Sequence, residues 1–172
     1  MNEILFHRLQ RSKIRRNFTS KMHKRTRERL NKFTTTNISD SLDALGLKGS
    51  TYGIRPIVEL RSSPKIIGEA ITIKIITAGL TKSEHHLGIK AIEIARKGDV
   101  IVIDNGGRTD TSCWGGVLAY SAKTKGVTGV VIDGACRDVD DYLEIDFPVC
   151  ARNSVVATAR GRIMEEATNV MI

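Results

Sequence analysis

The hydrophobic pattern of the first half of the chain predicts one short helix followed by strands. Between Thr34 and Gly46, apolar residues recur on one helical face, with capping oxygens before them and a glycine after them. Residues 56–60 and 66–76 are rich in β-branched side chains and alternate in part, which is typical of strands, and Gly68 indicates a bulge or bend. We expect a helix and then two strands here.

The second half of the chain alternates between helical and strand patterns. Residues 87–97 have helical spacing, and the unbroken β-branched run 100–103 predicts a strand buried on both faces. The same order returns in a helix over 115–125 and a largely apolar strand over 127–132. Helices that alternate with buried strands predict parallel strands joined by right-handed crossovers, and hence an α/β fold.

Composition and charge divide the chain into two parts. The 172 residues are 41% hydrophobic, which is enough for one domain with a core. The net charge is +8, but residues 1–32 carry a net of +9 and residues 33–172 a net of −1. We therefore expect a basic N-terminal extension over 1–32, helical or disordered, joined to a globular domain over 33–172. The extension suits an acidic protein or RNA as partner, or alternatively an organelle transit peptide.

Several classes of protein are excluded by what the sequence lacks. Lys74 interrupts the longest apolar run, residues 70–80, so no segment approaches the length of a membrane span. The apolar start of the chain is too short for a secretory signal. The cysteines, Cys113, Cys136 and Cys150, are odd in number and have no CxxC spacing, which favours buried free thiols in a cytoplasmic protein.

The candidate chemistry follows the predicted buried strands. In open α/β sheets, ligands collect beyond the carboxyl ends of the strands, here at residues 104–107 and 133–138, near a helix start at 115–118. The Arg137 guanidinium can bind a carboxylate through two hydrogen bonds, and Asp138 offers oxygen ligands for Mg²⁺ or Mn²⁺. Alternatively, both side chains cap the following turn and pair with acidic neighbours.

Other candidates are weaker. Glu84, His85 and His86 are consecutive, but successive side chains on a helix point about 100° apart, which favours a solvated helix start over a metal site. Trp114, beside two glycines, either shields a pocket or packs in the core. No histidine follows His86 in the chain, so the sequence shows no obvious base for a Ser or Cys nucleophile.

Five motifs in order carry a resemblance to a known family. They are TNISDSLDALGL (36–47), IGEAIT (67–72), GDVIVID (98–104), WGGVLA (114–119) and GVTGVVIDGACRD (126–138). Over residues 33–169 the chain resembles the RraA-like family, which includes regulators of ribonuclease E activity and 4-hydroxy-4-methyl-2-oxoglutarate aldolases that also decarboxylate oxaloacetate. The basic extension lies outside this resemblance.

The resemblance implies a fold, an assembly and a site. The fold is a swivelling β/β/α domain that assembles as a trimer, or multiples of one, with active sites between subunits. Arg137 would bind the substrate carboxylate and Asp138 a divalent cation. The substrate-binding loop would consist of Gly115, Gly116, Val117 and Leu118. The expected activity is therefore that of a class II (metal-dependent) aldolase, an oxaloacetate decarboxylase, or both. The alternative is a non-catalytic regulator that binds an RNA-processing enzyme such as ribonuclease E.

The chain departs from the family pattern at two places. Gly116 stands where metal-dependent aldolases of the family often have an acidic residue, and family members usually continue past Ile172 with structure that assists a neighbouring subunit. Aldol cleavage needs a base and decarboxylation does not, so the glycine should weaken the aldolase activity more. Without that later structure, strands from 66–76 or 147–151 would leave an edge or apolar face to be buried in a trimer. The alternative is a marginally stable remnant that needs another chain.

Overall fold

A mixed β-sheet forms the centre of the molecule. The computed structural model describes residues 22, 24–62, 65–80 and 86–172, and within them seven strands pair in the order β1-β5-β4-β3-β2-β7, with β6 beside β4. The strands are β1 (Arg55–Pro56), β2 (Ala70–Thr77), β3 (Val100–Ser112), β4 (Gly129–Cys136), β5 (Val149–Ala151), β6 (Asn153–Ser154) and β7 (Ile163–Thr168).

The inner strands are parallel, as the alternating pattern predicts. β2, β3, β4 and β5 run in the same direction, and Ile73, Ile103 and Ile132 stand side by side across the first three of them. All three isoleucine side chains are fully buried. The antiparallel strands β1 and β7 close the two edges. The expected α/β fold is confirmed.

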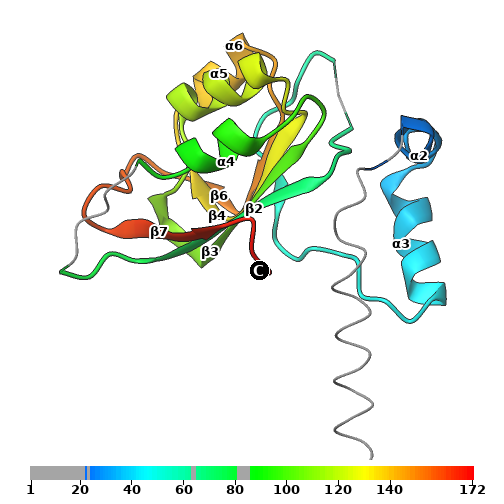
Figure 1. Ribbon diagram of the computed structural model, residues 1–172, viewed down its shortest axis with the longest axis horizontal. Helices are drawn as coiled ribbons and strands as arrows, with labels where there is room; N and C mark the ends of the chain where they lie inside the picture. Colours follow the sequence, from blue (N-terminus) through cyan, green and yellow to red (C-terminus); the bar gives the residue numbers. More distant parts are fainter. Residues whose placement is uncertain (1–21, 23, 63–64, 81–85) are drawn as a thin grey trace, which may run out of the picture.

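Three helices cover one face of this sheet (Figure 1). They are α4 (Ile89–Ile94), α5 (Gly116–Lys125) and α6 (Val139–Glu144). Each lies in a connection between consecutive parallel strands, as crossovers require. Gly126 ends α5 with φ of 85°, a left-handed conformation that glycine adopts without steric cost. The core between sheet and helices includes the fully buried rings of Trp114, Tyr142 and Phe147.

Two further helices, α2 (Lys24–Leu30) and α3 (Thr35–Ala44), lie apart from this layer (Figure 1). Thr34 and Asn37 form a reciprocal capping box at the start of α3, so the helix predicted after Thr34 is confirmed. The Arg27 guanidinium donates to the carbonyl of Gly98 at 2.7 Å and so ties α2 to the sheet domain. The expectation for the first 21 residues of the basic extension lies outside the described residues.

Several predicted boundaries are wrong. The strand expected over 56–60 is reduced to Arg55–Pro56, and the one expected from 66 begins only at Ala70, after a bend at Gly68. Residues 104–107, expected just beyond the end of a strand, instead continue β3, and the pairing of β3 with β4 shifts register there. The hydrophobic pattern of one segment does not predict such irregular pairing, because the pairing depends on the partner strand.

The strands expected to be exposed are in fact paired on both sides. β2 lies between β3 and β7, and β5 between β1 and β4. The prediction that either would leave an uncovered edge is therefore wrong. The reason is that residues 163–168 fold back as an antiparallel partner of β2. None of the helices in the described ranges is long and apolar enough to cross a membrane.

Candidate functional site

A small cavity opens where β4 ends and α5 begins. Its volume is about 160 Å³, below the roughly 300–1,000 Å³ of pockets that hold drug-sized ligands, so it suits a molecule of few heavy atoms. Its lining residues come from the segment before α4, the end of β3 and the loop after it, the first turn of α5, and the segments after β4 and before β7: His86, Leu87, Ser112, Cys113, Trp114, Gly115, Val117, Leu118, Arg137, Asp138, Thr158 and Ala159.

The carbonyl of Trp114 holds the two sides of this cavity together. It accepts hydrogen bonds from the backbone N–H of Arg137 at 3.0 Å, from Oγ of Ser112 at 2.9 Å and from the Tyr142 hydroxyl at 3.3 Å. Tyr142 and Ser112 are buried, so these bonds are shielded from water. The loop before α5 and the segment after β4 therefore have a fixed separation.

Asp138 is held in an unusual backbone conformation. Its φ and ψ are 58° and 49°, in the left-handed region where Asp and Asn are the most tolerated residues after Gly. Its Oδ2 accepts a hydrogen bond from the N–H of Gly116 at 3.0 Å and lies 3.2 Å from Nε of Arg137. Asp138 makes no side-chain cap on α6, and Arg137 pairs with Asp138 itself. The alternative of a side-chain cap on the following turn is therefore wrong for Asp138.

Two adjacent glycines allow the carboxylates to approach α5. A Cβ on Gly115 would lie 2.6 Å from Oδ2 of Asp138, and a Cβ on Gly116 would collide with the carboxylate of Asp141. The Asp141 carboxylate thus stands where a side chain at position 116 would begin. Gly116 is the one predicted site residue that does not line the cavity. Gly115, Val117, Leu118, Arg137 and Asp138 all do.

The donor set fits a small carboxylate and a hard cation. The first N–H groups of α5 belong to a ten-residue helix, whose N-terminus attracts anions, and the Arg137 side chain beside them is 41% exposed. Asp138, 37% exposed, supplies carboxylate oxygen, and Mg²⁺ commonly binds through one or two carboxylates while keeping waters and substrate oxygens. No group of three or more His, Cys, Asp or Glu side chains in the described ranges is placed to hold a metal ion.

The thiols near the cavity are unsuited to nucleophilic attack. Burial raises the pKa of Cys136 to about 11 and raises that of Cys113 further. Both side chains are therefore protonated near neutral pH, whereas the thiolate is the reactive form. The expected buried free thiols are confirmed for these two cysteines, and Cys150 is partly buried.

Seven lining residues lie outside the predicted site set, and three of them, Thr158, Ala159 and His86, come from segments that the sequence did not connect with the site. Thr158 and Ala159 precede β7 and have no local motif. His86 carries a signal in the EHH sequence, but a helix start was expected there, and α4 begins only at Ile89. Glu84 and His85 lie outside the described residues. The structure therefore brings His86 into one cavity with Arg137 and Asp138.

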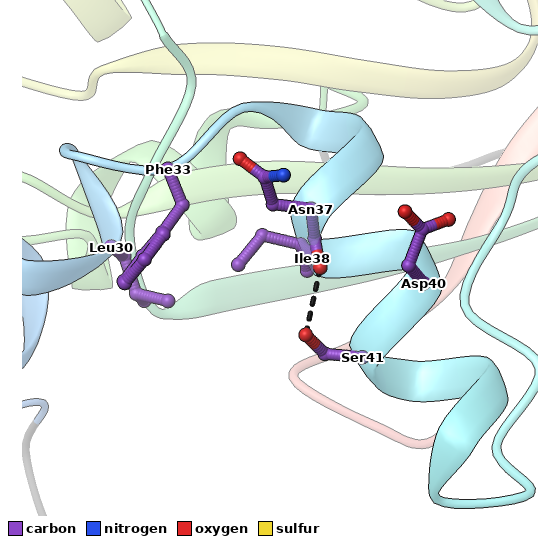
Figure 2. A pocket seen from close by; sticks show the side chains of 6 residues that line it. All are labelled: Leu30, Phe33, Asn37, Ile38, Asp40 and Ser41. Atoms are coloured by element: carbon purple, nitrogen blue, oxygen red, sulfur yellow. Dashed lines mark hydrogen bonds between the residues drawn. The ribbon is translucent and has the colours of Figure 1, made fainter.

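A second cavity lies between α2 and α3 (Figure 2). It has a volume of about 480 Å³, and Leu30, Phe33 and Ile38 make much of its wall. The polar groups of Asn37 and Ser41 serve α3 itself, in the capping box and in a bond from Ser41 Oγ to the carbonyl of Asn37 at 2.7 Å. Its described lining includes the Asp40 carboxylate but no Arg or Lys side chain, so it does not repeat the arginine–carboxylate pair of the first cavity.

Comparisons with known proteins agree with these motifs. A protein-family model described as RraA-like, Aldolase/RraA, matches residues 35–172. Protein DlpA of Legionella pneumophila is 34% identical over 126 residues, which cover 73% of this chain and 20% of DlpA. A Halalkalibacterium halodurans protein, provisionally named 4-hydroxy-4-methyl-2-oxoglutarate aldolase, is also 34% identical over 126 residues, or 73% of this chain and 55% of that protein.

A solved structure shows the same fold. RraAS2 of Streptomyces coelicolor, described as an unusual member of the RNase ES inhibitor RraA protein family, superposes with a TM-score of 0.75 at 23% identity. The match covers 88% of this chain and 74% of that one. The chain thus spans about half the length, or less, of the two curated relatives named above, although it covers most of the solved fold.

Proposed function

The chain belongs to the RraA-like family, and we propose that it is a divalent-metal-dependent lyase of small pyruvyl acids, acting in 4-hydroxy-4-methyl-2-oxoglutarate cleavage, oxaloacetate decarboxylation or both. The observation that carries the proposal is the meeting of Arg137, Asp138 and the start of α5 in one small cavity. Relatives provisionally named as these aldolases support it.

The residues have distinct roles in this proposal. Arg137 binds the carboxylate beside the keto group, since its planar fork matches two carboxylate oxygens. The N–H groups at the start of α5 orient the same end of the substrate. Asp138 would hold the cation, which supplies an electron sink for the charge that develops at the keto oxygen. The Trp114 carbonyl keeps these groups at fixed separations.

The two reactions place different demands on the protein. Both leave an electron pair on the carbon next to a ketone, so both need the binding groups just described. Decarboxylation releases carbon dioxide and requires no base, whereas aldol cleavage also requires removal of a hydroxyl proton. A chain with only Arg137 and Asp138 would therefore be a better decarboxylase than aldolase.

The test is pyruvate release from both substrates with Mg²⁺ or Mn²⁺, before and after addition of a chelator. We expect activity that the chelator removes and the metal restores. No release from either substrate, or rates unchanged by the chelator, would overturn the proposal.

A second candidate is a regulator of an RNA-processing enzyme, the role for which the related structure is named. The exposed Arg25 and Arg29 side chains of α2 favour it, since they extend the basic segment next to the domain. A titration of RNA and of an acidic partner enzyme against the full chain and a chain without residues 1–32 tests it. Binding that is unchanged by the deletion would show that the basic extension does not contribute to this role.

We also propose that the protein assembles as a trimer with this cavity near a subunit boundary. Val117, on the cavity wall, is 78% exposed, and Val156, close in sequence to the lining residue Thr158, is 96% exposed. Exposed apolar side chains beside a cavity favour cover by a neighbouring subunit. Sedimentation should show a discrete trimer, and a monodisperse monomer at micromolar concentration would contradict it.

A further inference from the structure

His86 lines the proposed substrate cavity together with Arg137 and Asp138, but it comes from a different part of the chain. It lies in the segment before α4, whereas the other two residues follow β4. The His86 side chain is exposed, so its ring can exchange protons with water. It is the one histidine among the described lining residues, and imidazole is the side chain that enzymes most often use as a general base.

A hydrogen bond determines which ring nitrogen of His86 is free. Nδ1 lies 3.0 Å from the carbonyl oxygen of Leu87. A carbonyl oxygen only accepts hydrogen bonds, so Nδ1 carries the proton in the neutral ring and Nε2 carries the lone pair. Nε2 is therefore the basic atom of this side chain.

The backbone that directly follows His86 is anchored to the domain. Leu87 is buried in the core, and the N–H of Gly88 donates to Oε2 of Glu165 in β7 at 2.9 Å. Gly88 has φ of 83°, and a Cβ on it would lie 3.3 Å from the ring of Trp114. The histidine is thus joined on its C-terminal side to a fixed segment, which helps to position a proton-transfer residue.

From this geometry we propose that His86 is the general base of aldol cleavage, the group that Arg137 and Asp138 do not supply. The inference rests on the proposed lyase function. Nε2 removes the proton of the C4 hydroxyl of 4-hydroxy-4-methyl-2-oxoglutarate, and the O–H electron pair forms the new C4 carbonyl. The C3–C4 bond breaks, and its electron pair passes to C3 and the C2 keto oxygen as the enolate of pyruvate. The proton returns from Nε2 to C3, so one substrate gives two pyruvates and His86 is regenerated.

The experiment compares the His86→Asn variant with the wild type on both substrates. Asparagine keeps a donor near the Nδ1 position but has no basic nitrogen. We expect kcat/KM for aldol cleavage to fall by about 10² to 10⁴, the usual contribution of a general base. Oxaloacetate decarboxylation, which needs no base, should stay within about threefold. Free imidazole should restore part of the lost aldolase activity and leave the decarboxylase activity unchanged.

The matched control is Lys90→Gln, an exposed change on α4 outside the cavity, which should alter neither activity. His86→Gln, which also lacks a base, provides a second variant, and both variants should keep the wild-type melting temperature. Equal losses on the two substrates, or no loss on either, would overturn the role of His86 while leaving the lyase proposal intact. A wild type that is inactive on both substrates would overturn the lyase proposal, and the role of His86 with it.

Discussion

The backbone N–H of Gly116 donates a hydrogen bond to Oδ2 of Asp138 at 3.0 Å, across a sequence separation of 22 residues. The same oxygen lies 3.2 Å from Nε of Arg137. The proposed cation ligand is therefore fixed to the N-terminus of α5 and to the proposed carboxylate-binding side chain together. Substitutions around this contact should separate effects on chemistry from effects on folding.

Replacing Asp138 by Asn should remove activity and keep the fold. Asn tolerates the left-handed backbone, and its side-chain oxygen can still accept from Gly116, but it lacks the charge that holds a cation. We expect a loss of about 100-fold or more in kcat/KM on both substrates, by analogy with the loss of one preorganised electrostatic group. Steady-state kinetics and Mn²⁺ binding measure it, with the exposed Asp140→Asn as control. Undiminished Mn²⁺ affinity in the Asp138 variant would argue against this ligand.

Gly115→Ala should displace the Asp138 carboxylate. The backbone of Gly115 is extended, with φ of −144°, so alanine causes no strain there, but its Cβ would lie 2.6 Å from Oδ2. A shift of about 1 Å in a reacting group can cost about 100-fold in rate, and we expect a loss approaching this size. Gly79→Ala, where a Cβ meets no atom within 4 Å, is the control. Equal kinetics for the two variants would show that Asp138 does not need its present position.

Gly116 and Asp141 should show a strong energetic interaction in a double-mutant cycle. A Cβ on Gly116 collides with the Asp141 carboxylate, so Gly116→Ala should lower the free energy of unfolding by about 1–3 kcal/mol, as overpacking does. In an Asp141→Ala background, the loss in the free energy of unfolding caused by Gly116→Ala should be smaller by about 1 kcal/mol or more, because the clash is gone. Urea unfolding of the four proteins measures the interaction. Strictly additive losses would mean that the two positions are independent.

Tyr142→Phe should lower the free energy of unfolding slightly and keep the fold around the cavity. The variant loses the hydroxyl that donates to the Trp114 carbonyl. The carbonyl still accepts hydrogen bonds from the N–H of Arg137 and from Oγ of Ser112. We expect a loss of about 1 kcal/mol in the free energy of unfolding, the usual net value of one hydrogen bond. Chemical denaturation measures it, and a loss of several times that value would indicate that the carbonyl depends on the tyrosine alone.

The ion pair between Lys74 of β2 and Asp104 of β3 should make stability depend on pH. The hydrogen bond from Lys74 lowers the pKa of Asp104, and Asp104 raises the pKa of Lys74 by the same contact. The carboxylate's contribution is present above its ordinary pKa of about 3.9 and is lost as the pH falls through the lowered value. The lysine's contribution is present below its ordinary pKa of about 10.4 and is lost as the pH rises through the raised value.

Asp104→Asn should therefore have a lower melting temperature than the wild type between about pH 4 and about pH 10, and the gap should close at either extreme. The control is Asp110→Asn, because Asp110 is 72% exposed and lies 3.9 Å from Arg108. Thermal melts across the pH series compare the variants. A gap that stays constant down to the lowest pH would rule out the ion pair as its source.

The features that depend on residues close together in the chain could be predicted from the sequence alone. Local chemistry predicts the capping box of Thr34 and Asn37 and the end of α5 at Gly126, because each involves residues within one helical turn. The parallel β2, β3 and β4 follow from buried runs separated by helices. Arg137 and Asp138 were located in the same way, because they come directly after such a strand.

Only the tertiary structure decided the far wall of the site and the edge of the sheet. Gly88 is bound by Glu165, 77 residues later, and β7 pairs with β2 across a comparable separation. No local period records which distant segment will meet an unpaired strand, because that choice depends on the total burial and hydrogen bonding of the folded chain. For this reason His86, read along the chain as part of a solvated helix start, lies in one cavity with Asp138.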